Sequence, residues 1–243
     1  MSLDAANSKK ISLVLFDIDG TLMITKGASS RCMKRAGQIV LGPTFQWHPV
    51  TVGTLDPQIF DQLATANGIA PTAEQRQRYE QVYLDELEKE LTERQEDITV
   101  LPGIASLVEL LHARSTDTGD VVLGVLTGNF RRATELKLQR SGLGIERFPV
   151  IACAEHGESR NDLPRIAIQM ANQQFGPRFD AANTILVGDT PRDIDCALAN
   201  NCKCVSVATG HYSAQQLIDA GGSPVVETLE NPAQLLSLIV APP

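Results

Sequence analysis

The sequence predicts an α/β protein in which a parallel sheet lies between two layers of helices. Short apolar segments alternate with segments of helical periodicity, and most of the apolar segments end at a polar residue or a glycine. Alternating strands and helices favour parallel pairing with right-handed crossovers, and continuous apolar strands fit a sheet covered on both faces. The alternation stops once, after the first strand, where charged helical patterns follow. Together these observations predict a Rossmann-like three-layer core with an inserted helical subdomain.

The strands of the core are expected where the apolar segments are short and rich in β-branched residues. They cover residues 10–16, 121–126, 148–152, 184–187 and 203–207. Core helices are expected at residues 104–114, 131–142, 161–175, 192–200, 213–220 and from 231 onward. Binding sites of such sheets lie beyond the carboxyl ends of the strands. Asp17, Thr127 and Asp189 follow three of these ends and are therefore candidate site residues.

The insertion is expected to divide the chain into two parts. Helical patterns cover residues 29–41, 57–67 and 72–95, and the last of them carries an apolar stripe that includes Tyr79 and Tyr83. We therefore expect a cap at residues 26–95 and a core formed by residues 1–25 and 96–243.

Composition excludes some classes of partner. The net charge of −8 disfavours nucleic acid, because a phosphate backbone favours a basic surface. No apolar run approaches the roughly 20 residues that cross a bilayer, and the polar N-terminal segment lacks the apolar stretch of a signal peptide. A cytoplasmic protein is expected.

The cysteines are scattered and odd in number, so we expect buried free thiols rather than disulfides at Cys32, Cys153, Cys196, Cys202 and Cys204.

The run Asp17-Ile18-Asp19-Gly20-Thr21 carries the strongest chemical signal. Carboxylates two residues apart in an extended chain point the same way, and close like charges are costly without a cation. Oxygen ligands of this kind suit Mg²⁺, and Gly20 allows a sharp turn past the site. Exposed acids at an ordinary strand-to-helix turn would give the same pattern, so the run by itself does not decide.

Two later segments supply the partners that this run needs. Thr127-Gly128-Asn129 joins a strand to a helix, and such a helix start favours anions. The segment from Asp189 to Asp193 also follows a strand. Asp193 fits a capping box with Thr190, whereas Asp189 is not explained in that way.

These three segments, in this order, resemble the first, second and fourth motifs of the haloacid dehalogenase superfamily, and the helical insertion resembles its cap. The resemblance implies that Asp17 is a nucleophile that forms an aspartyl-phosphate and that Asp19 is the general acid and base. It further implies that Thr127, with the Gly128 or Asn129 amide, binds the phosphoryl group. Mg²⁺ would be bound by Asp17, the Asp19 carbonyl and Asp189, and Asp193 would orient a neighbouring group.

The superfamily's third motif usually supplies a lysine near a proline, and the corresponding segment here has none. Arg160 precedes a predicted helix at a suitable distance before Asp189 and is assigned the cationic role; Arg165 is the second choice. The arginine fork differs in geometry from a lysine point charge. In the cap, Thr54 and Asp56 resemble a turn that reaches the substrate, although Asp56 before Pro57 also suits a helix N-cap.

The resemblance implies a Mg²⁺-dependent phosphatase that acts on a small phosphorylated metabolite, similar to the phosphoglycolate phosphatase branch. A phosphomutase of the β-phosphoglucomutase type is the alternative, because it shares the nucleophile. A catalytically silent binding protein on the same scaffold is less well supported, since no motif carboxylate is missing.

Overall fold

The computed structural model describes residues 11–239 of the chain. Residues 1–10 and 240–243 lie outside the described part. The first of these ranges includes the polar N-terminal segment and Lys10, the first residue of the first predicted strand. Among the helices of residues 11–239, none combines the length and the apolar character that a membrane span requires.

The core is built on a six-stranded sheet with the order β5-β4-β1-β6-β7-β8, in which all neighbours are parallel. Its strands are β1 (Ser12–Phe16), β4 (Val121–Leu126), β5 (Val150–Ala152), β6 (Thr184–Gly188), β7 (Lys203–Val207) and β8 (Val225–Val226). The predicted α/β class with a parallel sheet is confirmed. The sequence pattern missed β8, because two residues at a sheet edge are too few to show a period.

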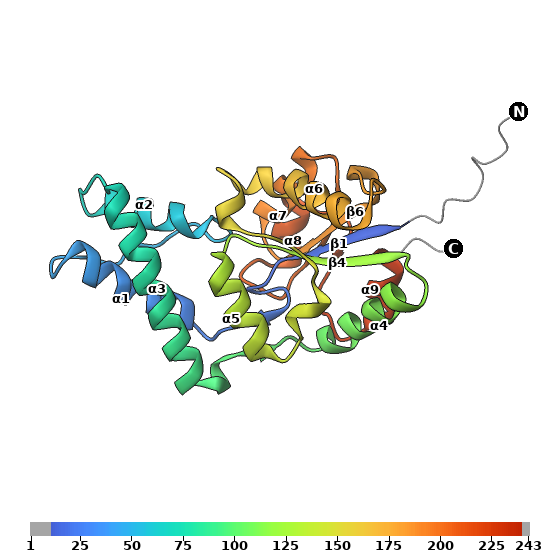
Figure 1. The fold of residues 1–243 in the computed structure, drawn as a ribbon, viewed down its shortest axis with the longest axis horizontal. Helices are drawn as coiled ribbons and strands as arrows, with labels where there is room; N and C mark the ends of the chain where they lie inside the picture. Colours follow the sequence, from blue (N-terminus) through green and yellow to red (C-terminus); the bar gives the residue numbers. More distant parts are fainter. Residues whose placement is uncertain (1–10, 240–243) are drawn as a thin grey trace, which may run out of the picture.

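Helices cover both faces of this sheet (Figure 1). They are α4 (Ile104–Asp117), α5 (Arg131–Ser141), α6 (Leu163–Phe175), α7 (Pro191–Ala199), α8 (Ala214–Asp219) and α9 (Pro232–Ile239). In β1, Leu13 and Leu15 pack into one apolar layer with α6, α7 and α8. Val14 and Phe16 pack into the other layer with α4 and α9. Short 3₁₀ turns lie at η1 (Gln95–Asp97), η2 (Ile145–Arg147), η3 (Ala154–His156), η4 (Arg160–Asp162) and η5 (Ala181–Asn183). The helix expected from residue 161 thus begins at Leu163, after η4.

The segment proposed as a cap contributes three helices that lie at one end of the molecule (Figure 1). They are α1 (Ala28–Leu41), α2 (Asp56–Ala66) and α3 (Ala73–Glu93). Their apolar faces form one cluster, which Phe130 and Leu136 of the core extend. Thr72 caps α3 in a capping box with Gln75, so this helix begins one residue later than predicted. A two-stranded antiparallel ladder, β2 (Met23–Ile24) with β3 (Thr99–Val100), joins the two ends of the segment.

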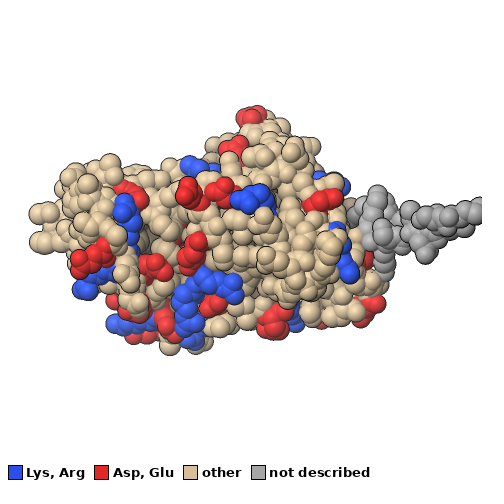
Figure 2. Space-filling view, turned by 45° about the horizontal axis from the view of Figure 1, so that its top comes forward, with Lys and Arg blue, Asp and Glu red and all other residues tan. Residues whose placement is uncertain are grey.

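Charged side chains of both signs are interspersed on the face shown in Figure 2. The partly buried ion pair of Arg31 with Glu90 and the exposed pair of Arg132 with Glu88 each join two helices. The five cysteines are buried and free, as expected.

Candidate active site

Three adjacent strands bring the predicted site residues together. Because β4, β1 and β6 are neighbours, Thr127, Asp17 and Asp189 all follow the carboxyl ends of adjacent strands. They lie at or beside a cavity of about 190 Å³ between the core and the cap. Its lining includes the predicted residues Asp17, Asp19, Thr54, Asp56, Thr127, Gly128, Asn129 and Arg160. The structure therefore brings these residues together, while their roles in catalysis and binding stay predictions.

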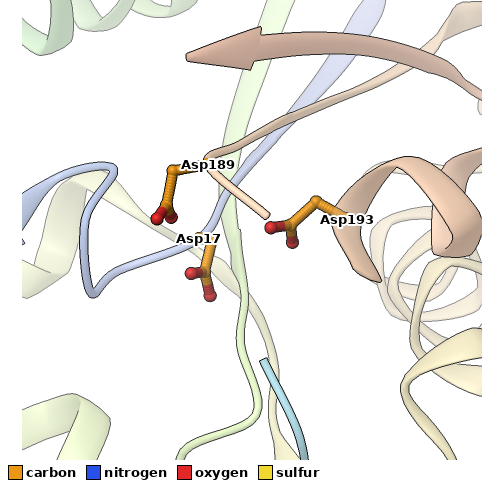
Figure 3. A group of neighbouring side chains, drawn as sticks. All are labelled: Asp17, Asp189 and Asp193. Atoms are coloured by element: carbon orange, nitrogen blue, oxygen red, sulfur yellow. The ribbon is translucent and has the colours of Figure 1, made fainter. Parts of the chain in front are cut away.

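A cluster of buried carboxylates lies at this edge of the sheet. The carboxyl groups of Asp17, Asp189 and Asp193 lie close together (Figure 3), and each offers an oxygen within 4.8 Å of the others. Burial raises the pKa of Asp17 to about 6, although Arg160 opposes the shift. Burial, together with the charges of Asp17 and Asp193, raises the pKa of Asp189 to about 8. Burial is the larger cause of both shifts, and the neighbouring carboxylates add to it.

Arg160 supplies the positive charge of the cluster. It is 5% exposed and begins η4, and its Nη2 lies 2.9 Å from Asp17 Oδ1 and 2.5 Å from Asp193 Oδ1. Its Nη1 donates to the Gly53 carbonyl oxygen at 3.2 Å. Arg165 is exposed on α6. Of the two arginines considered, the structure brings Arg160 to the carboxylates.

Asp193 both caps a helix and contacts the cation of the site, two roles that the sequence left as alternatives. Its Oδ2 accepts hydrogen bonds from the backbone N–H and the hydroxyl of Thr190, at 3.1 and 2.6 Å, which completes a capping box at the start of α7. Its Oδ1 faces Arg160. Since both oxygens are engaged, Asp193 is suited to orienting Arg160 and less suited to binding a metal ion.

The Asp189 carboxylate accepts a hydrogen bond from a hydroxyl group and packs against the backbone of two glycines. Thr21 Oγ1 donates to Asp189 Oδ1 at 3.0 Å. A Cβ atom on Gly20 would lie 2.3 Å from Asp189 Oδ2, and one on Gly210 would lie 1.7 Å from it. Gly20 also has a φ of 88°, which other residues rarely adopt. Any side chain at either glycine would displace the carboxylate.

The loop after β4 joins the site to the cap. Asn129 Nδ2 donates to Thr127 Oγ1 at 2.8 Å and to Asp19 Oδ2 at 2.9 Å. A Cβ atom on Gly128 would lie 2.5 Å from the Thr54 carbonyl oxygen, so glycine permits close packing of the cap loop. Thr54 Oγ1 is buried and has no hydrogen-bond partner within the described residues.

Asp56 has a structural contact that the sequence did not predict. It is the first residue of α2, and Leu55 is the N-cap, so the N-cap interpretation was wrong. Its Oδ2 accepts a hydrogen bond from the Phe130 N–H at 2.9 Å, and its own N–H donates to the Gly128 carbonyl at 2.7 Å. Burial raises its pKa to about 7, against an opposing effect of Lys137. Asp56 therefore ties the cap to the loop after β4.

Replacement of Asp56 by asparagine is expected to change the pH dependence of stability. Because the folded-state pKa of Asp56 lies above its ordinary value of 3.8, folding favours the protonated form. That contribution to stability is lost as the pH rises through about 7. Asp56→Asn can still accept from Phe130 and carries no charge. At about 1.4 kcal/mol per pKa unit, its unfolding free energy relative to wild type should rise by about 2–3 kcal/mol between pH 5 and pH 8.

Urea unfolding at several pH values measures this difference. Asp61→Asn is the matched control, because the Asp61 side chain is 42% exposed on the same helix and pairs with Arg76. The interpretation would be wrong if Asp56→Asn and wild type had parallel pH profiles.

Lys137 is a site residue that the sequence reasoning missed. It lies on α5 with a fully buried side chain, and its Nζ is 2.5 Å from Asp19 Oδ2 and 2.8 Å from Asn129 Oδ1. A helical lysine is ordinarily read as solvent-exposed. The available signal was its spacing: Lys137 lies four residues after the buried Ala133, on the inward face of the helix.

Fold and site together define an α/β protein with a buried acidic centre at the carboxyl edge of a parallel sheet. A family model described as haloacid dehalogenase-like hydrolase matches residues 14–207. The chain belongs to the haloacid dehalogenase-like hydrolases.

Similar proteins extend over nearly the whole chain. A phosphoglycolate phosphatase of Synechococcus elongatus is 26% identical and covers 93% of this chain and 96% of its own length. An N-acetylmuramic acid 6-phosphate phosphatase of Pseudomonas aeruginosa is 22% identical, with 95% of each chain covered. The crystal structure of CbbY from Rhodobacter sphaeroides in complex with phosphate has a TM-score of 0.73 at 18% identity, over 91% of this chain and 96% of that one. The structural likeness supports the fold.

Proposed function

We propose that this protein is a Mg²⁺-dependent phosphatase that hydrolyses a small phosphomonoester through an aspartyl-phosphate on Asp17. One observation carries the proposal: a buried Asp17 faces both Arg160 and Asp189 at the edge of a cavity of about 190 Å³. A carboxylate beside a cation and a second carboxylate fits a nucleophile in a phosphoryl-transfer site. The names of the two phosphatase relatives support the same reaction class.

The acidic centre fits a divalent cation. Asp17 and Asp189 offer oxygen ligands that lie within 4.8 Å of each other, and a divalent cation would offset the repulsion between these buried carboxylates. Asp17, Asp189 and the backbone carbonyl of Asp19 would hold Mg²⁺, while Asp193 remains engaged with Arg160 and Thr190. When bound, Mg²⁺ would neutralise charge on the phosphoryl oxygens.

The side chains of the site then divide the chemistry between them. A carboxylate oxygen of Asp17 attacks phosphorus while the bond from phosphorus to the leaving oxygen breaks. Asp19 gives that oxygen a proton; it then takes a proton from the water molecule whose oxygen attacks the aspartyl-phosphate, which releases phosphate and restores Asp17. Thr127 and the Gly128 or Asn129 amide bind the phosphoryl oxygens, and Arg160 offsets their charge.

The cap side of the cavity favours a substrate whose remaining part is uncharged. The exposed residues Ser30 and Thr51 belong to the lining together with His211, and Arg160 is the one Lys or Arg among the described residues that line it. Arg160 already pairs with Asp17 and Asp193. A mutase binds a sugar bisphosphate and therefore needs cations for a second phosphate. The lining thus favours the phosphatase over the phosphomutase alternative.

The binding-protein alternative, the cytoplasmic location and the absence of nucleic-acid partners stay predictions.

Turnover of p-nitrophenyl phosphate tests the proposal. Purified protein should release p-nitrophenol with Mg²⁺ and lose nearly all turnover in EDTA, and Mg²⁺ should also raise the melting temperature because it binds the folded state. Monophosphates of neutral polyols should be hydrolysed without any sugar bisphosphate. Undiminished turnover in EDTA would contradict metal dependence, and a strict need for a bisphosphate activator would favour the mutase.

A further inference from the structure

A buried ammonium group lies behind the proposed acid–base carboxylate. Lys137 is 0% exposed, and its neighbours along α5, Leu136 and Leu138, are buried apolar residues. A buried ammonium is costly unless it is paired, so leucine or methionine would fill the same space at lower cost. The contacts of Lys137 are with Asp19 and Asn129. Its charge therefore acts on the site.

Asn129 restricts the geometry of this contact. Lysine has no hydrogen-bond acceptor, so the atom of Asn129 that faces Lys137 Nζ at 2.8 Å must be the carbonyl oxygen. The Asn129 amide nitrogen then donates to Thr127 Oγ1 at 2.8 Å and to Asp19 Oδ2 at 2.9 Å. One oxygen of Asp19 thus receives two donors from two different elements.

The other oxygen of Asp19 is available to a substrate. Oδ1 has no hydrogen-bond partner among residues 11–239, and the Asp19 side chain is 41% exposed and lines the cavity beside Asp17. With Oδ2 held by two donors, rotation of the carboxyl group would break both hydrogen bonds. The carboxylate is therefore fixed with Oδ1 directed away from Lys137.

We propose that Lys137 is a positioning residue that holds Asp19 through Oδ2, so that Oδ1 delivers the proton to the leaving oxygen of the ester. This inference rests on the proposed function. As the bond from phosphorus to oxygen breaks, the proton moves from Asp19 Oδ1 to the leaving oxygen, and Oδ2 keeps its hydrogen bonds to Lys137 and Asn129. Lys137 acts through Asp19 and does not line the cavity itself.

Leaving-group dependence separates this role from a purely structural one. A good leaving group such as p-nitrophenolate needs little protonation, whereas phenolate needs more. For Lys137→Met, kcat/KM should fall less than roughly 10-fold with p-nitrophenyl phosphate but roughly 100-fold with phenyl phosphate, since general acid catalysis contributes about 10²–10⁴. Lys137→Arg should restore part of the loss with phenyl phosphate.

Two comparisons complete the experiment. Arg140→Met removes an exposed cation from the same helix, where Arg140 donates to Thr92, and should leave both substrates unaffected. In an Asp19→Asn background, Lys137→Met should not change the ratio of the two kcat/KM values any further. An equal loss for both substrates, or a further change in that background, would overturn the inference.

Folding is followed separately by the melting temperature. If Lys137→Met does not fold, Lys137→Gln removes the charge and shortens the donor side chain, so the larger loss with phenyl phosphate should remain but be smaller than expected for Lys137→Met. A wild-type protein that is inert toward every phosphomonoester would instead refute the proposed function. Failure of the positioning role is therefore distinguishable from failure of the phosphatase proposal.

Discussion

Asp17→Asn is expected to lose phosphatase turnover by roughly 10⁴-fold or more, because an amide oxygen is a poor nucleophile for phosphorus. The variant should fold. The amide oxygen that replaces the carboxylate can still accept a hydrogen bond from Arg160, which lies 2.9 Å from Asp17 in the wild-type protein. The substitution also removes one charge from a cluster in which Asp17 raises the pKa of Asp189. Without metal, the melting temperature of the variant should therefore equal or exceed that of wild type.

Initial rates with p-nitrophenyl phosphate and Mg²⁺, beside melting curves with and without Mg²⁺, measure both effects. Stabilisation by Mg²⁺ should be smaller in the variant, because one ligand carboxylate is gone. Asp85→Asn is the matched control, since Asp85 lies on α3 and bonds to Gln81 at the surface. Turnover within 10-fold of wild type would exclude Asp17 as the nucleophile.

The second large effect is expected for Arg160→Met. Removal of the guanidinium leaves Asp17 and Asp193 without the cation that both contact. Breaking a buried ion pair costs about 3–5 kcal/mol, so the unfolding free energy should fall by about that amount. Loss of the charge facing the phosphoryl group should lower kcat/KM by roughly 10³-fold.

Arg165→Met separates the two candidate cations of the third motif. Arg165 is exposed on α6, and its replacement should change the unfolding free energy by less than about 0.5 kcal/mol and leave kcat/KM unchanged. Arg160→Lys should retain more activity than Arg160→Met, but lysine cannot reproduce the fork that reaches Asp17, Asp193 and the Gly53 carbonyl together. If the Arg165 variant were the inactive one, the assignment would be reversed.

The grouping of the site residues at one edge of the sheet was predictable, because the ends of buried strands can be located from the sequence. A buried apolar strand that stops at Asp17 or Asp189 marks the sheet edge at which binding groups gather, and the ordered motifs identified which edge. Arg160 was predictable from its position before Asp189, although its contacts with Asp193 and Gly53 were not.

The remaining features depend on contacts between distant segments. Lys137 and Asp19 are far apart in the chain, and helical periodicity alone does not distinguish a buried, paired lysine from an exposed one. Asp56 was expected either to contact the substrate or to cap a helix, and the sequence did not show that its carboxylate accepts a hydrogen bond from the N–H of Phe130. The strands β2 and β3 of the antiparallel ladder each have two residues, which is too short for the alternation of apolar and polar residues that identifies a strand in a sequence.

That ladder has a consequence for protein engineering. Ile24 pairs with Thr99 and Met23 with Val100, so the chain leaves the core and returns to it at backbone positions that are hydrogen-bonded to each other. A segment with adjacent ends can be exchanged for one of different length without moving the ends that remain. Chimaeras joined at Ile24 and Thr99 could therefore place the intervening segment of a related hydrolase on this core. Asp17, Asp189 and Asp193 would be retained, and the new segment would have to supply a carbonyl oxygen where Gly53 accepts from Arg160.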